Sequence, residues 1–482
     1  MSNQDEQTSF LRSTVKNLSQ YVPQIPKPKR RVSLKEKIVW TGIALFAYLI
    51  MGQIPLYGVT DDPRFDFLAF ARVIFAAQQG TLMELGIGPI VTAGLLMQLL
   101  KGSGLIKMDF KNPDDRSLFT SATKIVTIGV IVAEGVLYGF SVYGPLTAEE
   151  ARHAIYVVIA QLIGASVIVM LMDEMVQKGW GIGSGLSLFI AAGVAQTILW
   201  NVFSVVPADD GPVGIFPFTI HAIVNGNGTD AIFREGQLPS LLVLALTITV
   251  ILILVYIEGI HVDVPIVSTK YRGFKAVYPI KLLYTSVIPV ILASALTANA
   301  VFMGQMMWAN YNPNNQNPVF NWIAQFDPNS QGAQATPTGG ILYYLTPPRG
   351  LDTAIADPLR AALYVLVMTG IITVFSRLWV ELGGLSGRAA ARNLLDADVQ
   401  VPGFRRAEGT VEALLNKYIP ALTLLSGIIV GLLASTSDVL NILGTGTGIL
   451  LMVSILVSYY QTLVKEHIDS QMPALAGVLG RK

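Results

Sequence analysis

Residues 86–104 read GIGPIVTAGLLMQLLKGSG and decide the fold. The apolar run from Ile87 to Leu100 opens on a Gly-Pro pair and is too short to cross about 30 Å of hydrocarbon comfortably. Just before it, residues 64–79 read RFDFLAFARVIFAAQQ, which is amphipathic and also too short to span. Two half-length helices are therefore predicted where a membrane protein would ordinarily place one full-length helix.

The remainder of the chain has the composition of a membrane protein. Of the 482 residues, 52% are hydrophobic and 13% are charged, and this charged share is about half that of a soluble domain. Apolar runs of about 20 residues, the length of a membrane-crossing helix, recur along the sequence. The basic N-terminus has no cleavable apolar region, so we expect no signal peptide. The sequence predicts an all-α polytopic membrane protein.

Nine strong spans accompany the short segment. They lie near residues 38–58, 118–143, 154–177, 185–205, 239–260, 280–306, 359–381, 413–436 and 439–464. With the segment 86–101 they make ten crossings, which puts both termini on the same side of the membrane. The two long outer loops, 206–238 and 307–356, are rich in Asn, Gly and Pro and are expected to be irregular.

The distribution of positive charge sets the orientation. Of the 33 Lys and Arg residues, 27 then lie on the inner side and six on the outer side. The outer six are Arg64, Arg72, Arg152, Arg234, Arg349 and Arg360. Because excess positive charge marks cytoplasmic loops, both termini are expected to be cytoplasmic. Omitting the short segment would invert every later loop and destroy this bias, so the short segment is expected to cross.

Five spans precede the first long outer loop and five follow it, which predicts two inverted five-helix halves, as in many transporters and pores. Sequence similarity between the halves is not evident, so the repeat is inferred from topology. The predicted parts are a basic cytosolic segment 1–37, an N-terminal half 38–205, the external loop 206–238, a C-terminal half 239–464 and a cytosolic tail 465–482.

Two inner loops carry basic tips. Loop 261–281 alternates like a strand pair around its tip, and loop 383–412 is a second basic projection. The basic residues singled out are Lys270, Arg272, Arg405 and Arg406. A phosphate-rich cytosolic partner would be attracted to them, although ordinary positive-inside bias is the alternative explanation. On the outer side, Asn227 begins an NGT sequon of low specificity, and no role follows for loop 307–356.

Catalytic and metal chemistry find little support in the sequence. The chain has no Cys and four His, and the His residues all fall in loops or at span ends, so we expect no metal site, cofactor or catalytic residue. Glu134 is the only acid clearly in the middle of a span, which disfavours a proton relay. Ser386 lies in a GLSG motif typical of an intramembrane protease, but Arg388 follows it and no span offers a His to accept the proton.

The residues collected above resemble a known family. GIGPIVTAGLLMQLLKGSG, the block TKYRGFKAVYPIKLLYTSVIPVILASALTANA (269–300) and GTGTGILLMV (444–453) are similar to the protein-conducting channel SecY of bacteria and archaea and Sec61α of eukaryotes. The similarity runs in order from about residue 28 to residue 466 and is closer to the archaeal and eukaryotic branch. It implies ten transmembrane helices in two inverted halves around a central pore, with a half-helix plug.

The resemblance also implies site residues. The first half-helix, about 64–80, would be the plug, and the second, 86–103, would complete the crossing. The implied pore ring is Ile87, Val91, Leu186, Ile190, Ile291 and Leu451. The lateral gate would lie between 86–103 and 280–306, with Thr92 and Asn299 as its polar residues. The two basic tips would be the docking sites for a ribosome or a motor.

The resemblance thus implies the central subunit of a protein translocase in the plasma membrane, and not an enzyme. It would pass nascent, unfolded polypeptides outward and release hydrophobic segments and signal sequences sideways into the lipid bilayer. The resemblance implies two small membrane partners, similar to SecE or Sec61γ and to SecG or Sec61β, and a ribosome or cytosolic ATPase as driver. The alternative hypothesis is a secondary transporter of small solutes, which would share ten spans and inverted repeats.

Overall fold

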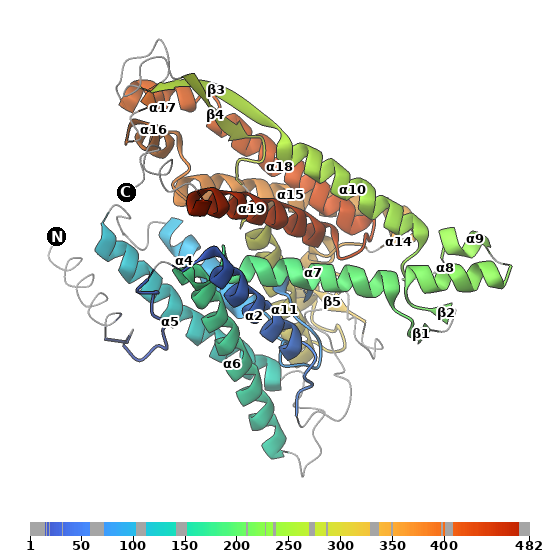
Figure 1. Cartoon of the computed structure of the whole chain (residues 1–482). Coiled ribbons are helices and arrows are strands. Elements are labelled where there is room, and N and C mark those ends of the chain that lie inside the picture. Colours follow the sequence, from blue (N-terminus) through green and yellow to red (C-terminus); the bar gives the residue numbers. More distant parts are fainter. Residues whose placement is uncertain are drawn as a thin grey trace. The chain divides into compact units, whose positions relative to one another are not determined.

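The computed structural model is mostly helical (Figure 1). It describes residues 15, 17–18, 20–30, 32–57, 72–102, 112–140, 152–208, 211–226, 228–234, 238–268, 275–285, 288–327, 337–348, 350–396, 399–400 and 408–471. The chain forms two compact units, and each is described by itself. The first unit is Met1–Ala192 with Ala295–Tyr343, and the second is Gly193–Ser294 with Tyr344–Lys482.

Eight helical stretches in the described part of the chain are long and apolar enough to cross a membrane. They correspond to α5 (Pro113–Tyr138), α6 (Arg152–Met175) with the turn η4 (Val176–Trp180), α7 (Gly185–Phe203), α10 (Leu241–Gly259), α11 (Ile288–Tyr311), α15 (Pro358–Leu382), α18 (Ile419–Val439) and α19 (Gly446–Gln471). The other two predicted crossings are α2 (Leu34–Met51) and the shorter α4 (Gly88–Gly102). The count of ten crossings therefore remains a prediction.

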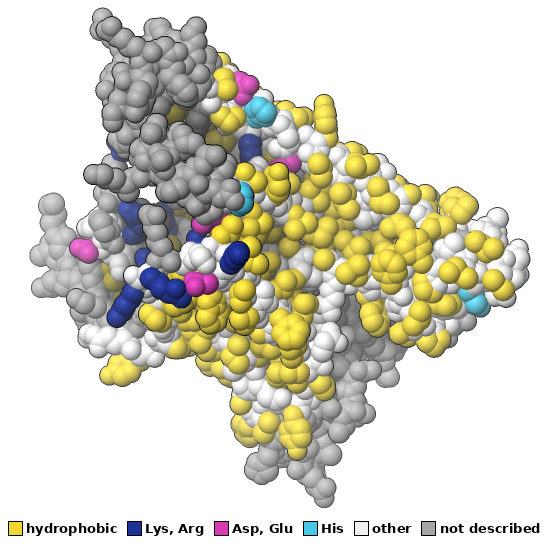
Figure 2. Space-filling view, in the orientation of Figure 1, with side chains coloured by type: hydrophobic (Ala, Val, Ile, Leu, Met, Phe, Trp, Pro, Cys, Tyr) yellow, Lys and Arg dark blue, Asp and Glu magenta, His cyan; other side chains and the backbone are white. Residues whose placement is uncertain are grey.

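Apolar residues cover the outside of these helices as well as the inside. On α10, Ile248, Leu252 and Tyr256 are 51%, 65% and 75% exposed, and Figure 2 shows hydrophobic side chains over much of this helix. A helix that is apolar all round belongs in a membrane or in the core of a large protein. The exposed apolar face of α10 is therefore a lipid-facing surface.

The first unit packs around aromatic pairs. Tyr48 of α2 stacks on Phe189 of α7 with ring centroids 5.0 Å apart, and Tyr138 of α5 stacks on Phe302 of α11 at 6.2 Å. Helix α5 begins where the sequence favours a start, because Asn112 caps it and a proline follows at the first helical position. The unit also contains α3 (Arg72–Phe75), α12 (Pro318–Ile323), β5 (Gln325–Phe326), β6 (Pro337–Gly339) and the start of α13 (Ile341–Leu345).

The second unit is built on α10, α15, α18 and α19, with a sheet at one end. Strands β3 (His261–Ser268) and β4 (Lys275–Lys281) form the antiparallel hairpin that the alternation in loop 261–281 predicted. Strand β7 (Val399–Gln400) joins the edge of β3, so both inner loops contribute to one sheet. Helices α16 (Gly387–Asp396) and α17 (Glu408–Leu415) lie beside it (Figure 1), and Val264, Ile280 and Leu415 share a buried apolar cluster there.

Several boundaries differ from the sequence expectations. The span expected at 280–306 begins at Ile288, because the β3–β4 hairpin extends to the pair His261 and Lys281. The span expected at 439–464 begins at Gly446, after a turn in which Asn441 and Thr445 have positive φ. The span expected at 38–58 ends at Met51, where Gly52 caps α2.

The described parts of the two loops predicted on the outer side contain more regular structure than expected. Loop 206–238 contains β1 (Pro207–Ala208), β2 (Gly211–Pro212), α8 (Ile215–Val224) and α9 (Gly228–Ile232), and loop 307–356 contains α14 (Leu351–Ala356) in addition to the elements named above. Arg234 holds α8 in place, because its guanidinium lies 3.7 Å from the centre of the Phe218 ring and donates to the Pro212 carbonyl at 3.0 Å. The sequon residue Asn227 lies outside the described residues.

Candidate functional site

Four of the six predicted pore residues lie in the first unit. Ile87 immediately precedes α4 and Val91 lies one turn later, where its N–H donates to the Ile87 carbonyl at 3.1 Å. Ile87 is fully buried and Val91 is 8% exposed. On α7, Ile190 is buried and Leu186 is half-buried.

The other two predicted pore residues lie in the second unit. Ile291 is half-buried on the first turn of α11, and Leu451 is fully buried on α19. All six side chains are aliphatic, and each is buried or half-buried. Their convergence on one axis stays a prediction, because the six are divided between the two units.

The two predicted gate residues are in contact within the first unit. The Asn299 side-chain amide on α11 donates to the Thr92 hydroxyl on α4 at 3.0 Å, and that hydroxyl donates to the Gly88 carbonyl at 2.9 Å. The Glu134 side chain on α5 lies close to the Thr92 hydroxyl. One polar cluster therefore links three spans. The sequence singled out Glu134 as the only mid-span acid but did not place it beside Thr92.

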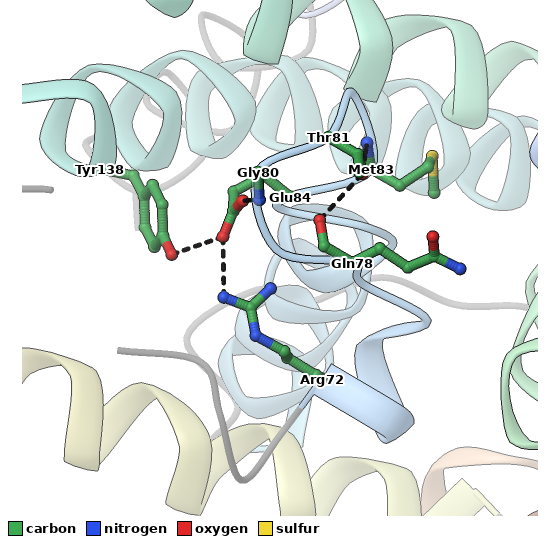
Figure 3. Close-up of polar contacts among 7 residues, drawn as sticks. All are labelled: Arg72, Gln78, Gly80, Thr81, Met83, Glu84 and Tyr138. Atoms are coloured by element: carbon green, nitrogen blue, oxygen red, sulfur yellow. Dashed lines mark hydrogen bonds and ion pairs between the residues drawn. The ribbon is translucent and has the colours of Figure 1, made fainter. Parts of the chain in front are cut away.

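A second polar cluster anchors the segment that returns from the predicted plug (Figure 3). The Glu84 side chain is completely buried and accepts hydrogen bonds from Tyr138 Oη at 2.7 Å and from Arg72 Nη2 at 2.9 Å. Its other oxygen accepts from the Gly80 N–H. One carboxylate thus joins α3, the following turn and the end of α5, and no pattern in the sequence connects these residues.

Backbone hydrogen bonds hold the same return segment against its neighbours. The Ile87 N–H donates to the Phe75 carbonyl at 2.7 Å, and the buried Tyr48 hydroxyl donates to the Ala76 carbonyl at 3.1 Å. The expected half-helix 86–103 is therefore present as α4, and the chain immediately before it folds back against α2. Of the expected plug 64–80, residues 64–71 lie outside the described residues.

The predicted docking residues Lys270, Arg272, Arg405 and Arg406 also lie outside the described residues. In the described parts of the two loops, Val267 and Ser268 of β3 pair with Gln400 and Val399 of β7. Main-chain pairing thus joins the two loops that carry the basic residues.

The described residues include no group of three or more His, Asp and Glu residues that could hold a metal ion. The GLSG motif has a structural explanation, because the Ser386 hydroxyl accepts from the Ala389 N–H at 3.4 Å. Ser386 thus caps the start of α16, which is a common role for serine.

Apolar spans, a half-length helix preceded by a returning segment, and a polar cluster between spans define a helical membrane protein. Family comparisons agree along most of the sequence. The SecY family model matches residues 81–460, and the model of the plug domain of Sec61p matches residues 46–80. The chain belongs to the SecY family.

Known relatives resemble the chain over nearly its full length. It is 38% identical over 481 residues to the protein translocase subunit SecY of Pyrococcus furiosus, which covers 97% of this chain and 99% of that protein. A solved protein-conducting channel matches with a TM-score of 0.80 and 35% identity, over 95% of this chain and 98% of that one. Sec61 in the canine ribosome-channel complex from the endoplasmic reticulum matches with a TM-score of 0.78 and 34% identity, over the same shares.

The chain is therefore a SecY/Sec61α protein translocase subunit, a multi-pass membrane channel with a plug. The archaeal-type resemblance in the sequence is confirmed by the Pyrococcus relative. Nothing in these comparisons supports the alternative of a solute transporter.

Proposed function

We propose that this subunit conducts unfolded polypeptides through a neck lined by Ile87, Val91, Leu186, Ile190, Ile291 and Leu451. The observation that carries the proposal is the family match along residues 81–460, which contains all six positions. Burial supports it, because four of the six side chains are no more than 8% exposed. A constriction of bulky aliphatic groups excludes water when closed and so acts as a hydrophobic gate.

The lateral gate in this proposal is the contact between α4 and α11 around Thr92 and Asn299. A seam that must open for each signal sequence should be held by weak interactions. Hydrogen bonds between membrane helices contribute only about 0.6–2 kcal/mol each, and the neutral Asn299–Thr92 bond is of this kind. Opening there would let a hydrophobic segment pass from the pore into lipid.

Asn299→Ala is expected to make the channel accept weaker signal sequences. The substitution removes the donor to Thr92, and losing about 1 kcal/mol shifts the ratio of open to closed gates about fivefold. The measurement is export of a precursor whose signal sequence has been shortened until the unmodified channel barely exports it. Thr92→Ser and Glu134→Gln are the matched controls, because both keep hydrogen-bonding groups and should leave export nearly unchanged. An Asn299→Ala channel as stringent as the unmodified one would remove the gate assignment.

The basic tips are proposed to dock the ribosome. Lys270, Arg272, Arg405 and Arg406 are cations, and ribosomal RNA is a dense array of phosphates. The pairing of β3 with β7 supports a single docking surface, because it joins the two loops that carry the four cations.

Arg272→Ala and Arg405→Ala are expected to weaken ribosome binding, most strongly at low ionic strength. Each arginine–phosphate interaction that is removed should lower the slope of log K against log salt concentration by roughly one. Co-sedimentation of channels with ribosomes at several salt concentrations measures this slope. Arg388→Ala is the matched control, because Arg388 lies in the same loop but pairs with Glu412 at 3.3 Å. Ribosome binding that is unchanged in both Arg272→Ala and Arg405→Ala would contradict the docking proposal.

The remaining parts of the proposal concern assembly and orientation. Two small membrane subunits, similar to SecE or Sec61γ and to SecG or Sec61β, would pack on the outside of the helix bundle. Both termini would be cytoplasmic and the membrane would be the plasma membrane, as the excess of Lys and Arg in the inner loops supports. The energy for transport would come from the bound ribosome or a cytosolic motor.

A further inference from the structure

A buried carboxylate caps the N-terminus of α7, one of the helices that carry proposed pore residues. Asp173, in the last turn of α6, is 7% exposed. Its Oδ1 accepts the N–H of Leu186 at 2.9 Å, and Gly185 at the start of α7 lies against the backbone of Asp173. Its Oδ2 accepts from the Gln177 side-chain amide at 2.7 Å. The start of α7 is thereby tied to the span that precedes it.

The pore helix α19 starts in the same way in the second unit. Asp438, in the last turn of α18, is 8% exposed. Its Oδ1 accepts the N–H of Gly446 at 2.7 Å and that of Thr447 at 3.3 Å. Its Oδ2 accepts from the Tyr364 hydroxyl at 3.2 Å. In both units, the carboxylate accepts from the first turn of the next helix and also from a side-chain donor.

Both pore helices begin with a glycine because the acid's own helix lies against them. A Cβ on Gly185 would lie 2.7 Å from the Cα of Asp173, and a Cβ on Gly446 would lie 2.6 Å from the amide nitrogen of Asp438. Neither distance is compatible with a side chain. The start of each helix is therefore held both by contact and by hydrogen bonds.

Each capped helix carries its pore residue at the same distance from its own first residue. Ile190 is the sixth residue of α7 and Leu451 is the sixth residue of α19. At 1.5 Å per residue, each lies about 7.5 Å along the axis from its glycine. Both are buried, with 1% and 0% of their surfaces exposed. The two halves lack evident overall sequence similarity, yet they share the acid, the glycine and the spacing.

We propose that Asp173 and Asp438 are positioning residues that fix the depth of Ile190 and Leu451 in the channel neck. The inference rests on the proposed pore ring. The free N–H groups and positive dipole end of a helix favour a carboxylate at its start. In the ten-span topology, α7 and α19 cross in opposite directions and therefore begin at opposite membrane surfaces. Asp173 would fix the position of Ile190 from one surface, and Asp438 would fix that of Leu451 from the other. Without its carboxylate, the first turn of a pore helix can unwind or slide, and the aliphatic ring loses its register.

The first test is the ion leak of the whole purified channel in planar bilayers without substrate. Asp173→Ala and Asp438→Ala are each expected to raise the leak about fivefold, which is the shift in the open-to-closed ratio that loss of a typical cap produces. Asp173→Asn and Asp438→Asn keep a capping oxygen and should stay near the unmodified leak. Ser240→Ala is the matched control, because Ser240 caps α10, a span without a proposed pore or gate residue.

The second test measures which positions on α7 and α19 face the polypeptide in the channel. A photo-crosslinker placed in turn at positions 189, 190 and 191, and at 450, 451 and 452, should react with a stalled chain most at 190 and 451. Asp173→Ala is expected to shift the crosslinking maximum away from position 190 and leave the maximum at 451 unchanged. Asp438→Ala is expected to shift the maximum away from 451 and leave the maximum at 190 unchanged. A general loss of stability would blur both maxima together.

Two outcomes overturn the inference: alanine variants with an unmodified leak and unmoved maxima, or a Ser240→Ala channel that leaks as much as they do. If the alanine variants do not accumulate, Asp173→Glu and Asp438→Glu retain the charge but displace the oxygens by one methylene. They are expected to move the same maxima, and unmoved maxima contradict the inference. An unmodified channel without crosslinks at 190 and 451 would instead refute the proposed pore.

Discussion

An Ile87→Asn channel is expected to conduct ions at rest at least roughly tenfold more than the unmodified channel. Ile87 is fully buried, and an amide forced into an apolar site without partners costs about 1–3 kcal/mol. A neck that contains this amide can recover that energy by admitting water, which removes the dewetting barrier to ions. The same change should let defective signal sequences open the channel. Conductance across planar bilayers and export of a signal-defective precursor measure the two effects.

Two controls separate wetting of the neck from other effects of the substitution. Ile87→Leu conserves volume and apolar character, so the channel should stay closed. Ile248→Asn places the same amide on α10, where Ile248 is 51% exposed, and should not raise the conductance. Unchanged conductance and unchanged signal stringency in Ile87→Asn would contradict the ring assignment.

Glu84→Leu is expected to cost about 3–5 kcal/mol of folding free energy, which is typical when one partner of a buried ion pair is removed. The change takes the shared acceptor from Arg72, Tyr138 and the Gly80 N–H. Arg72→Met should cost less, because the carboxylate keeps its other two donors. Tyr138→Phe should cost about 1.5–3 kcal/mol, the contribution of one hydrogen bond to a charged group. Denaturant unfolding of the purified channel tests this order.

An exposed ion pair provides the comparison for the buried one. Arg30 and Glu36 lie 3.2 Å apart with 75% and 38% of their side chains exposed, and such pairs contribute about 0–1 kcal/mol. Arg30→Met should therefore have little effect on unfolding. If Glu84→Leu were no more destabilising than Arg30→Met, the buried carboxylate would not anchor the return segment.

The contacts at Glu84 and at Thr92 differ in strength, and this difference suits the two different roles proposed for them. The return segment beside the plug is held by a buried ion pair and two further hydrogen bonds to Glu84. The seam between α4 and α11 carries a neutral amide–hydroxyl bond. Since neutral hydrogen bonds are weaker than charge-assisted ones, the proposed gate can open while the anchor beside it stays formed.

The sequence predicted the parts of the fold that repeat a local pattern. Apolar length identified the spans, the Gly-Pro start identified α4, and strand-like alternation identified the β3–β4 hairpin. Thr92 and Asn299 came from the family resemblance, and the structure places their side chains in contact. Each of these features is encoded within about 20 consecutive residues or in a family motif.

The remaining features depend on contacts between residues far apart in the chain. Glu84 meets Arg72 and Tyr138 only because the chain turns back, and none of the three is unusual in its own segment. Strand β7 has two residues and therefore no periodicity, so its pairing with β3 could not be predicted. The late start of α19 follows from a side-chain cap by Asp438, eight residues before Gly446, which apolar length alone does not reveal.

The most direct test of the channel is photo-crosslinking from position 91 in membranes that carry a stalled, half-exported chain. The pore assignment predicts a crosslink from Val91 to the nascent chain that disappears when its signal sequence is deleted. Absence of that crosslink, and of crosslinks from positions 190 and 451, would mean that the polypeptide does not pass between these helices and would contradict the pore assignment.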